Sequence, residues 1–253
     1  MWFTTTAFSG LSILFVSLLA LSKTMSMRGP FILLEGVDRC GKTTQCKLLT
    51  SRFANAVPMN FPDRSTAIGK TINSYLTNST EMDDHAIHLL FSANRWEAVP
   101  FLTKQLREGK PVICDRYGFS GVAFTAAKEI NGMGIEWCKR CDVGQPKPDA
   151  VIFLTLSGDD AESRGGFGDE RYEKTEFQEK VRAVFKKLQD GENSHVVKDG
   201  EEIDAGANWF EVDAKGSIEE VQERINKVVD IVCKRVENGG KLGRMFEDGE
   251  YQL

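Results

Sequence analysis

The chain has 253 residues, of which 41% are hydrophobic and 27% charged, the balance of a globular protein that can bury a sizeable core. Lys and Arg total 32 against 37 Asp and Glu, and this formal net charge of −5 argues against a general binder of polynucleotides or anionic membranes. The six cysteines stand at irregular spacings, which favours a reduced intracellular protein over a disulfide framework.

Residues 1–28 differ in composition from the rest of the chain. They contain no acidic residue, and the stretch from Ala7 to Leu21 is an apolar run broken only by Ser and Gly. The run is short for a membrane span, and the first positive side chain, Lys23, follows it instead of preceding it as in a secretory signal. We expect a dispensable extension or a weak targeting leader on a protein of the cytoplasm, with the nucleus as an additional location. A membrane anchor or mitochondrial targeting is the alternative, and membrane contact is expected only if this extension is retained as an anchor.

Beyond residue 28 the pattern predicts alternating strands and helices. Continuous apolar runs at residues 31–34, 111–114 and 150–154 are typical of strands buried on both faces. Shorter strands are expected at 57–61 and at 209–212, the latter at an edge or as the final strand. Helical spacing of apolar residues predicts helices over 42–53, 84–107, 177–188 and 217–232.

Several local signals set the expected ends of these elements. Thr80 with Asp83, and Ser217 with Glu220, have the spacing of capping boxes, and Pro100 is expected to kink or interrupt its helix. Residues 190–208 are polar and contain glycine, so we expect a surface loop there. Strands separated by helices imply one α/β domain, residues 29–240, with a central parallel sheet flanked by helices and a polar tail at 241–253. Ligands of such sheets bind at the carboxyl ends of the strands.

Residues 36–43, Gly-Val-Asp-Arg-Cys-Gly-Lys-Thr, match the phosphate-binding pattern G-x-x-x-x-G-K-[ST] between a predicted strand and a predicted helix. Backbone N–H groups of such a loop wrap a phosphate, and the helix N-terminus adds partial positive charge. Lys42 would then reach the β- and γ-phosphates, and Thr43 would ligate Mg²⁺. The candidate ATP-binding residues of the loop are Gly36, Arg39, Cys40, Gly41, Lys42, Thr43 and Thr44.

Two charged residues inside this loop favour a kinase with a small acceptor over a nucleotide hydrolase. Asp38 puts a carboxylate among groups that hold anions, which is unfavourable unless a sugar hydroxyl or a metal-bound water partners it. Arg39 suits the stabilisation of charge on a transferred phosphoryl group. The alternative is that both are solvated loop side chains.

Candidate acceptor-side residues follow two predicted strands. Asp115 and Arg116 end the strand 111–114, where the carboxylate can hold Mg²⁺ through water and the guanidinium can grip a phosphate; a surface ion pair is the alternative. Arg64 follows the strand 57–61 and is a candidate for a second phosphate clamp.

Two further segments are candidates for contacts to a nucleotide. Phe91 and Arg95 are four residues apart on one predicted helix, so a ring that stacks on a base and a guanidinium that hydrogen-bonds it share a face. A core Phe beside an exposed Arg is the alternative. Residues 164–172 are rich in glycine and carry Arg164 and Arg171, as expected of a lid over the phosphates or of an ordinary loop.

Together these segments resemble the eukaryotic type of thymidylate kinase. The resemblance covers about residues 29–235 and rests on residues 34–42, 61–66, 88–97, 115–124, 146–149 and 164–173, in the order of the family. It implies a P-loop kinase fold with a short lid at 164–173. It also implies transfer of the γ-phosphoryl group of ATP to dTMP with Mg²⁺, and a homodimer.

The resemblance also implies roles for single residues. Phe91 would stack on thymine and Arg95 would hydrogen-bond its carbonyl edge, while Asp38 would meet the deoxyribose 3′-hydroxyl. The implied dTMP-binding residues are Asp38, Phe61, Arg64, Phe91, Arg95, Arg116, Gly121, Phe124 and Tyr172. Those implied for catalysis are Asp38, Arg39, Lys42, Asp115 and Arg116, with Thr43 and Asp115 for Mg²⁺ and the lid residues Arg164 and Arg171 for ATP.

Other functions compete with this one. A deoxynucleoside kinase, or another pyrimidine nucleoside monophosphate kinase, shares a phosphate loop and an acidic-Arg strand end, but the first has less need for two arginines on an acceptor phosphate. A GTP-dependent switch would need an Asn-Lys-x-Asp motif, which residues 146–149 do not supply. A non-catalytic nucleotide-binding protein is the remote alternative, and the complete phosphate loop argues against it.

A few residues depart from the family pattern or stand outside it. Cys40 occupies a position at which the family often has Ala or Gly. Cys138 and Cys141 lack a second pair for a metal site, so we interpret them as structural thiols. His85 and His88 are expected to satisfy local hydrogen bonds.

Overall fold

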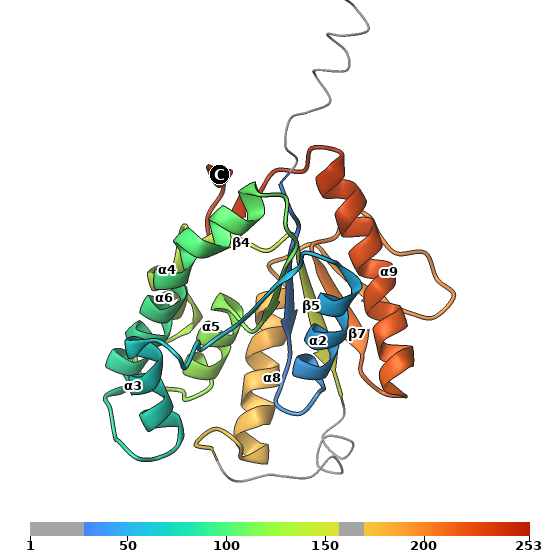
Figure 1. Ribbon diagram of the computed structural model, residues 1–253. Coiled ribbons are helices and arrows are strands. Elements are labelled where there is room, and N and C mark those ends of the chain that lie inside the picture. Colours follow the sequence, from blue (N-terminus) through green and yellow to red (C-terminus); the bar gives the residue numbers. More distant parts are fainter. Residues whose placement is uncertain (1–27, 157–169) are drawn as a thin grey trace, which may run out of the picture.

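The computed structural model describes residues 28–156 and 170–253, which form a parallel sheet with helices on both faces (Figure 1). The strands lie in the order β2-β3-β1-β5-β7-β6. Their bounds are β1 Phe31–Glu35, β2 Val57–Asn60, β3 Val112–Asp115, β5 Ala150–Thr155, β6 Ser194–Val197 and β7 Trp209–Asp213. The main helices are α2 Lys42–Arg52, α3 Ala67–Leu76, α4 Asp84–Arg107, α5 Gly118–Ala126, α8 Thr175–Gln189 and α9 Ile218–Glu237.

Two apolar layers explain why the strands are continuous hydrophobic runs. Alternate side chains of a strand point to opposite faces of the sheet. Phe31 and Leu33 of β1 accordingly pack with α4, α5 and α8, whereas Ile32 and Leu34 pack with α2 and α9. All four are fully buried, so β1 lies at the centre of the molecule and carries the phosphate loop at its carboxyl end.

The five predicted strands are confirmed, and the fifth is the last strand of the main sheet along the chain but does not lie at an edge, while the predicted loop 190–208 contains a further strand. β7 lies between β5 and β6, and its Trp209 and Phe210 are buried on opposite faces. The edge of the sheet beyond β7 is formed by β6, which lies inside the segment expected to be a loop. Only Val197 of β6 is buried, so this edge strand has too few apolar residues to stand out in the sequence.

The helix ends follow their predicted caps in one case and not in the other. Ser217 and Glu220 form the predicted capping box of α9. Asp83 alone caps α4, accepting hydrogen bonds from the N–H groups of His85 and Ala86, and Thr80 takes no part. α4 continues through Pro100, which is exposed, so the helix tolerates the ring at the loss of one backbone hydrogen bond.

The segment after residue 240 packs against the domain, which corrects the expectation of a polar tail. The two-residue strand β8 (Gly243–Arg244) pairs antiparallel with β4 (Pro146–Lys147). Leu242 and Met245 beside it are buried in the core. A short helix, α6 (Ile135–Lys139), and a 3₁₀ turn, η2 (Arg140–Asp142), lead into β4. Within the described ranges no helix is both long and apolar enough to cross a membrane.

Candidate active site

A cavity of about 830 Å³ lies at the carboxyl ends of β1, β2 and β3. It collects the phosphate loop and residues of α2, α5 and the start of α9, together with Phe91 and Arg95 of α4 and with Glu170, Tyr172 and Glu173. Predicted site residues that line it are Asp38, Arg39, Cys40, Gly41, Lys42, Thr43, Thr44, Phe61, Arg64, Phe91, Arg95, Asp115, Arg116, Gly121, Phe124 and Tyr172. Gly36 and Arg171 do not line it, and Arg164 lies outside the described residues.

The phosphate loop leaves β1 through a turn that requires glycine. Gly36 has a φ of 144°, and a Cβ there would lie 2.6 Å from the carbonyl oxygen of Leu154. Lys42 folds back over the loop, and its Nζ donates to the carbonyl oxygen of Val37 at 2.7 Å. Cys40 is buried and packs among the apolar residues between the sheet and α2. The thiol therefore fits the loop.

Thr43 and Asp115 meet at the mouth of the phosphate loop. The Oγ1 of Thr43, on the first turn of α2, donates to Oδ2 of Asp115 at 2.7 Å. A hydroxyl and a carboxylate are hard oxygen ligands, and Mg²⁺ takes only one or two such groups from a protein because it keeps waters and phosphate oxygens. The pair therefore fits Mg²⁺, although the described residues contain no cluster of three His, Cys, Asp or Glu side chains.

Asp38 and Arg116 form an ion pair on the cavity wall. Arg116 pairs with Oδ1 of Asp38, and Gln178 of α8 donates to Oδ2 at 2.6 Å. Burial opposes the charge of Arg116, but the carboxylates of Asp38 and Asp115 hold its pKa above its ordinary value. The partner that Asp38 needed thus comes from the protein itself, which sequence reasoning did not foresee.

A buried carboxyl group, Glu35, fixes the chain around Arg116. Its Oε1 accepts hydrogen bonds from the N–H groups of Tyr117 and Ser120, each at 3.0 Å, and its Oε2 accepts one from Oγ of Ser120 at 2.5 Å. These bonds hold the turn in which Arg116 has a φ of 67°. Burial raises the pKa of Glu35 despite the hydrogen bond from Ser120 and the nearby charge of Arg116.

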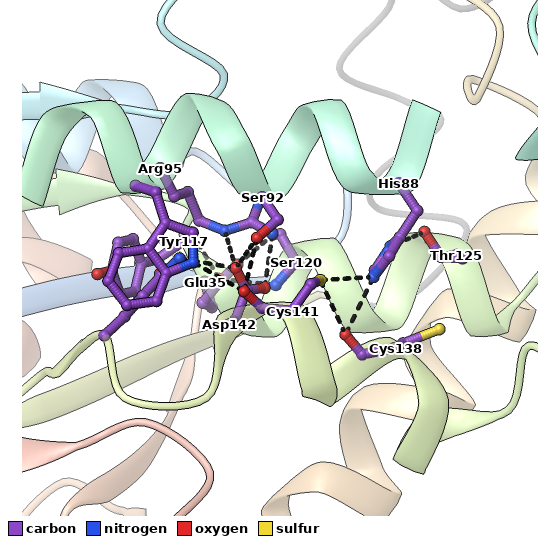
Figure 2. Close-up of polar contacts among 12 residues, drawn as sticks. Glu35, His88, Ser92, Arg95, Tyr117, Ser120, Thr125, Cys138, Cys141 and Asp142 are labelled. Carbon is purple, nitrogen blue, oxygen red and sulfur yellow. Dashed lines mark hydrogen bonds and ion pairs between the residues drawn. The ribbon is translucent and has the colours of Figure 1, made fainter. Parts of the chain in front are cut away.

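Phe91 and Arg95 of α4 both line the cavity, as their spacing predicted. The Arg95 side chain is only 2% exposed, which excludes the alternative of a solvated arginine. Its partner is Asp142 of η2, which is completely buried (Figure 2). Sequence reasoning missed Asp142 because no motif marks it, and the two residues meet only through the packing of η2 on α4.

Acidic residues at the start of the described range 170–253 contact the cavity arginines. Both terminal nitrogens of Arg64 donate to the carboxylate of Glu170, at 2.7 and 3.0 Å. Glu173 lies 3.5 Å from Arg39. Tyr172 stacks on Phe177 and lies beside Phe124, and burial raises its pKa.

The structure differs from the predicted site at Arg171, which does not line the cavity, and at the start of α9, which does. Arg171 lies over the ring of Tyr75, 4.1 Å from its centroid, and pairs with Glu81, which takes it away from the cavity. Gly216, Ser217, Ile218 and Val221, at the start of α9, line the wall near the phosphate loop and were not anticipated. Their only sequence signal was the capping box, which places a helix N-terminus there.

His88, Cys138 and Cys141 do not line the cavity and make local hydrogen-bond contacts with one another and with Thr125. Nδ1 of His88 shares a hydrogen bond with Oγ1 of Thr125 at 2.7 Å, and its Nε2 lies 3.0 Å from the carbonyl oxygen of Cys138. Burial lowers the pKa of His88 and raises that of Cys138 to about 12. Cys138 and Cys141 are both free thiols, as expected of structural cysteines.

Comparisons with known proteins agree on one family. The family model of thymidylate kinase matches residues 34–225. A human thymidylate kinase is 48% identical over 224 residues, which is 87% of this chain and 98% of that protein. One from Dictyostelium discoideum is 43% identical over 85% of this chain and 91% of its own length. The solved thymidylate kinase of Candida albicans superposes with a TM-score of 0.71 at 36% identity, over 83% of this chain and 94% of that chain.

Proposed function

The chain belongs to the thymidylate kinase family, and on that premise we propose how its residues carry out the family reaction. It is an ATP-dependent dTMP kinase with a P-loop kinase fold, and it converts dTMP and ATP into dTDP and ADP on the route to dTTP. The observation that carries the site assignment is a single cavity that contains both the phosphate loop and the Phe91–Arg95 pair. A deoxynucleoside kinase and a non-catalytic protein are not favoured.

dTMP occupies the end of the cavity lined by α4 and α5. Phe91 stacks on the base and Arg95 donates to its carbonyl edge, while Phe124 and Tyr172 enclose the sugar; all four line the cavity. Arg64 and Arg116 hold the phosphate. Because Glu170 now occupies the fork of Arg64, the phosphate takes the place of this carboxylate when dTMP binds.

ATP lies along the phosphate loop at the other end. Its phosphates accept hydrogen bonds from the loop N–H groups and from Lys42, and Arg39 faces the transferred group. The apolar wall of Ile218 and Val221 lies where the nucleoside would rest. Asp38 orients Arg116 through their ion pair, and its second oxygen, held by Gln178, is the one available to a sugar hydroxyl.

Transfer needs little from the protein except position and charge. A phosphate oxygen of dTMP attacks the γ-phosphorus, the bond to the β–γ bridging oxygen breaks, and ADP leaves with that oxygen. The acceptor phosphate is already an anion, so no general base is required. Thr43 and Asp115 would hold Mg²⁺, which neutralises phosphate charge when bound. Lys42, Arg39 and Arg116 stabilise the charge that remains.

The functional unit is a homodimer in this proposal. Three large apolar side chains of α4 are exposed, Leu89 and Phe101 at 51% and Trp96 at 39%. A group of exposed apolar residues on one helix is typical of a protein interface. A second copy of the chain would cover them.

The reaction can be tested with the purified chain, ATP–Mg²⁺ and a panel of dTMP, dUMP, UMP, CMP, AMP and thymidine. We expect dTMP to be preferred. Lys42→Met and Arg116→Ala should each lower kcat/KM for dTMP by roughly 100- to 1000-fold, because each removes a group that stabilises phosphate charge. Lys187→Ala, at an exposed position of α8, is the matched control and should leave activity unchanged. Preference for another acceptor, or full activity of Arg116→Ala, would contradict the assignment.

A further inference from the structure

The guanidinium of Arg95 is held on one edge by a single carboxylate. Its Nε donates to Oδ1 of Asp142 at 3.1 Å and its Nη2 donates to Oδ2 at 2.6 Å, a bidentate arrangement (Figure 2). The Arg95 side chain is 2% exposed and that of Asp142 is not exposed at all. Water therefore does not compete for this edge, and the direction of the guanidinium is set by where Asp142 stands.

Asp142 is itself fixed from several sides. Its Oδ1 also accepts hydrogen bonds from Oγ of Ser92 and from Nε2 of Gln145, each at 2.8 Å. The carbonyl oxygen of the preceding residue, Cys141, accepts from Ser92 Oγ at 2.9 Å and from Trp96 Nε1 at 2.7 Å. Donors on two successive turns of α4 thus hold the segment that carries the carboxylate.

A glycine of α5 supports the guanidinium from another direction. A Cβ at Gly121 would lie 2.6 Å from Nη2 and 2.9 Å from Nη1 of Arg95. Both distances are too short for a carbon atom, so a side chain at this position would displace the guanidinium. The guanidinium consequently lies against the bare backbone of Gly121, and both residues line the cavity. The group is confined between Asp142 on its inner edge and Gly121 on α5.

A guanidinium has five N–H groups and no acceptor. With one on Nε and one on Nη2 given to Asp142, the two on Nη1 and the second on Nη2 are left for the cavity. They suit a carbonyl oxygen at C4 of a pyrimidine, as in thymine and uracil. Against the amino group at C4 of cytosine they would place donor against donor.

We infer that Asp142 is the positioning residue that aims Arg95 at the C4 substituent, and that with Gly121 it determines the preference for 4-oxo over 4-amino pyrimidine nucleotides. This rests on the proposed contact of Arg95 with the base. The pair has little reason to exist for stability alone, because the desolvation of two buried charges offsets most of their attraction. Burial opposes the charge of Arg95, but the charge and the hydrogen bond of Asp142 raise its pKa.

The experiment compares dTMP and dCMP as acceptors for the full chain and for Asp142→Asn. The amide keeps the size of the side chain but loses the charge and turns N–H groups toward Nη2. We expect KM for dTMP to rise roughly 10- to 100-fold, the range for one charge-assisted hydrogen bond, with kcat and KM for ATP nearly unchanged. The ratio of kcat/KM for dTMP over dCMP should fall by roughly tenfold or more.

A matched control separates positioning from stability. His88→Gln changes a buried polar residue of α4 two turns away that contacts neither Arg95 nor Asp142 by a hydrogen bond. It should lower the melting temperature and leave the dTMP-to-dCMP ratio unchanged. If Asp142→Asn folds poorly, Gly121→Ala moves the same guanidinium from the α5 side, and alanine favours the helix. It should lower the ratio as well.

The double variant Arg95→Ala with Asp142→Asn separates the contact of Arg95 with the base from the positioning role of Asp142. If Asp142 acts only through Arg95, adding Asp142→Asn to Arg95→Ala should not change the dTMP-to-dCMP ratio further. It should raise the free energy of unfolding above that of Arg95→Ala, because it removes an unpaired buried charge. An unchanged ratio in Arg95→Ala alone would overturn the base contact in the proposed function. A lowered ratio in Arg95→Ala with a normal ratio in Asp142→Asn would overturn the positioning role and leave the base contact standing.

Discussion

The carboxyl group of Glu35 is completely buried at the end of β1 and is bonded to two residues that line the cavity. It accepts the hydrogen bonds of Tyr117 and Ser120 and so holds the turn that carries Arg116. Neutral glutamine can accept the same two N–H groups, but alanine cannot. Acceptor capacity and charge are thus separable at this residue.

Glu35→Ala should lower the free energy of unfolding by about 1–3 kcal/mol for each of the two backbone N–H groups left without a partner. Glu35→Gln should be as stable as the wild type or more stable. The folded pKa of Glu35 lies above its ordinary 4.5, so its contribution to stability is complete below pH 4.5 and is lost as the pH rises through the folded pKa. The advantage of Glu35→Gln over wild type should therefore grow from pH 4.5 upward in urea unfolding. A constant difference would refute the buried charge.

Elements with a continuous or periodic apolar pattern could be predicted from the sequence. β1, β3 and β5 are buried on both faces, and α8 and α9 each bury one apolar stripe. α5 and β8 were not predicted. α5 is mostly apolar and its Ser120 and Thr125 are buried, so it lacks the exposed polar face that marks a helix. β8 is a two-residue strand that pairs only with β4. Such elements depend on tertiary contacts that local pattern does not encode.

The pairing of β8 with β4 allows a test of whether residues 241–253 contribute to the stability of the domain. Met245 is fully buried, its N–H donates to the carbonyl oxygen of Gln145 at 2.8 Å, and its neighbour Phe246 packs edge-on against Phe119. Met245→Ala should lower the free energy of unfolding by about 2–5 kcal/mol, the usual loss for a large buried side chain. Exposed Asp248→Ala should change it by less than about 0.5 kcal/mol. If residues 241–253 were a detached tail, the two variants would be equally stable.

Across the whole molecule, the motif-bearing half of the site was predictable and the supporting half was not. Local sequence signals marked the phosphate loop, the strand end at Asp115 and Arg116, and the i, i+4 pair Phe91 and Arg95. The fold brings these residues to one cavity. Their partners come from elsewhere: Gln178 is 140 residues from Asp38 along the chain, and Asp142 is 47 from Arg95. A single sequence records no such pairing. Hence the residues that line the cavity could be predicted from their motifs, whereas the side chains that orient them could be identified only in the fold.

The apolar surface of α4 bears on the assembly of the whole protein. Leu89 and Phe101 are half exposed, and exposed apolar groups favour association. Leu89→Glu and Phe101→Glu should shift the proposed dimer to monomer in sedimentation velocity at micromolar concentration, because each would place a charge in a desolvated interface. Val196→Glu makes the same change at a position on β6 that is 49% exposed, and should leave the dimer intact. A monomeric wild type, or dissociation by Val196→Glu alone, would show that α4 is not the interface.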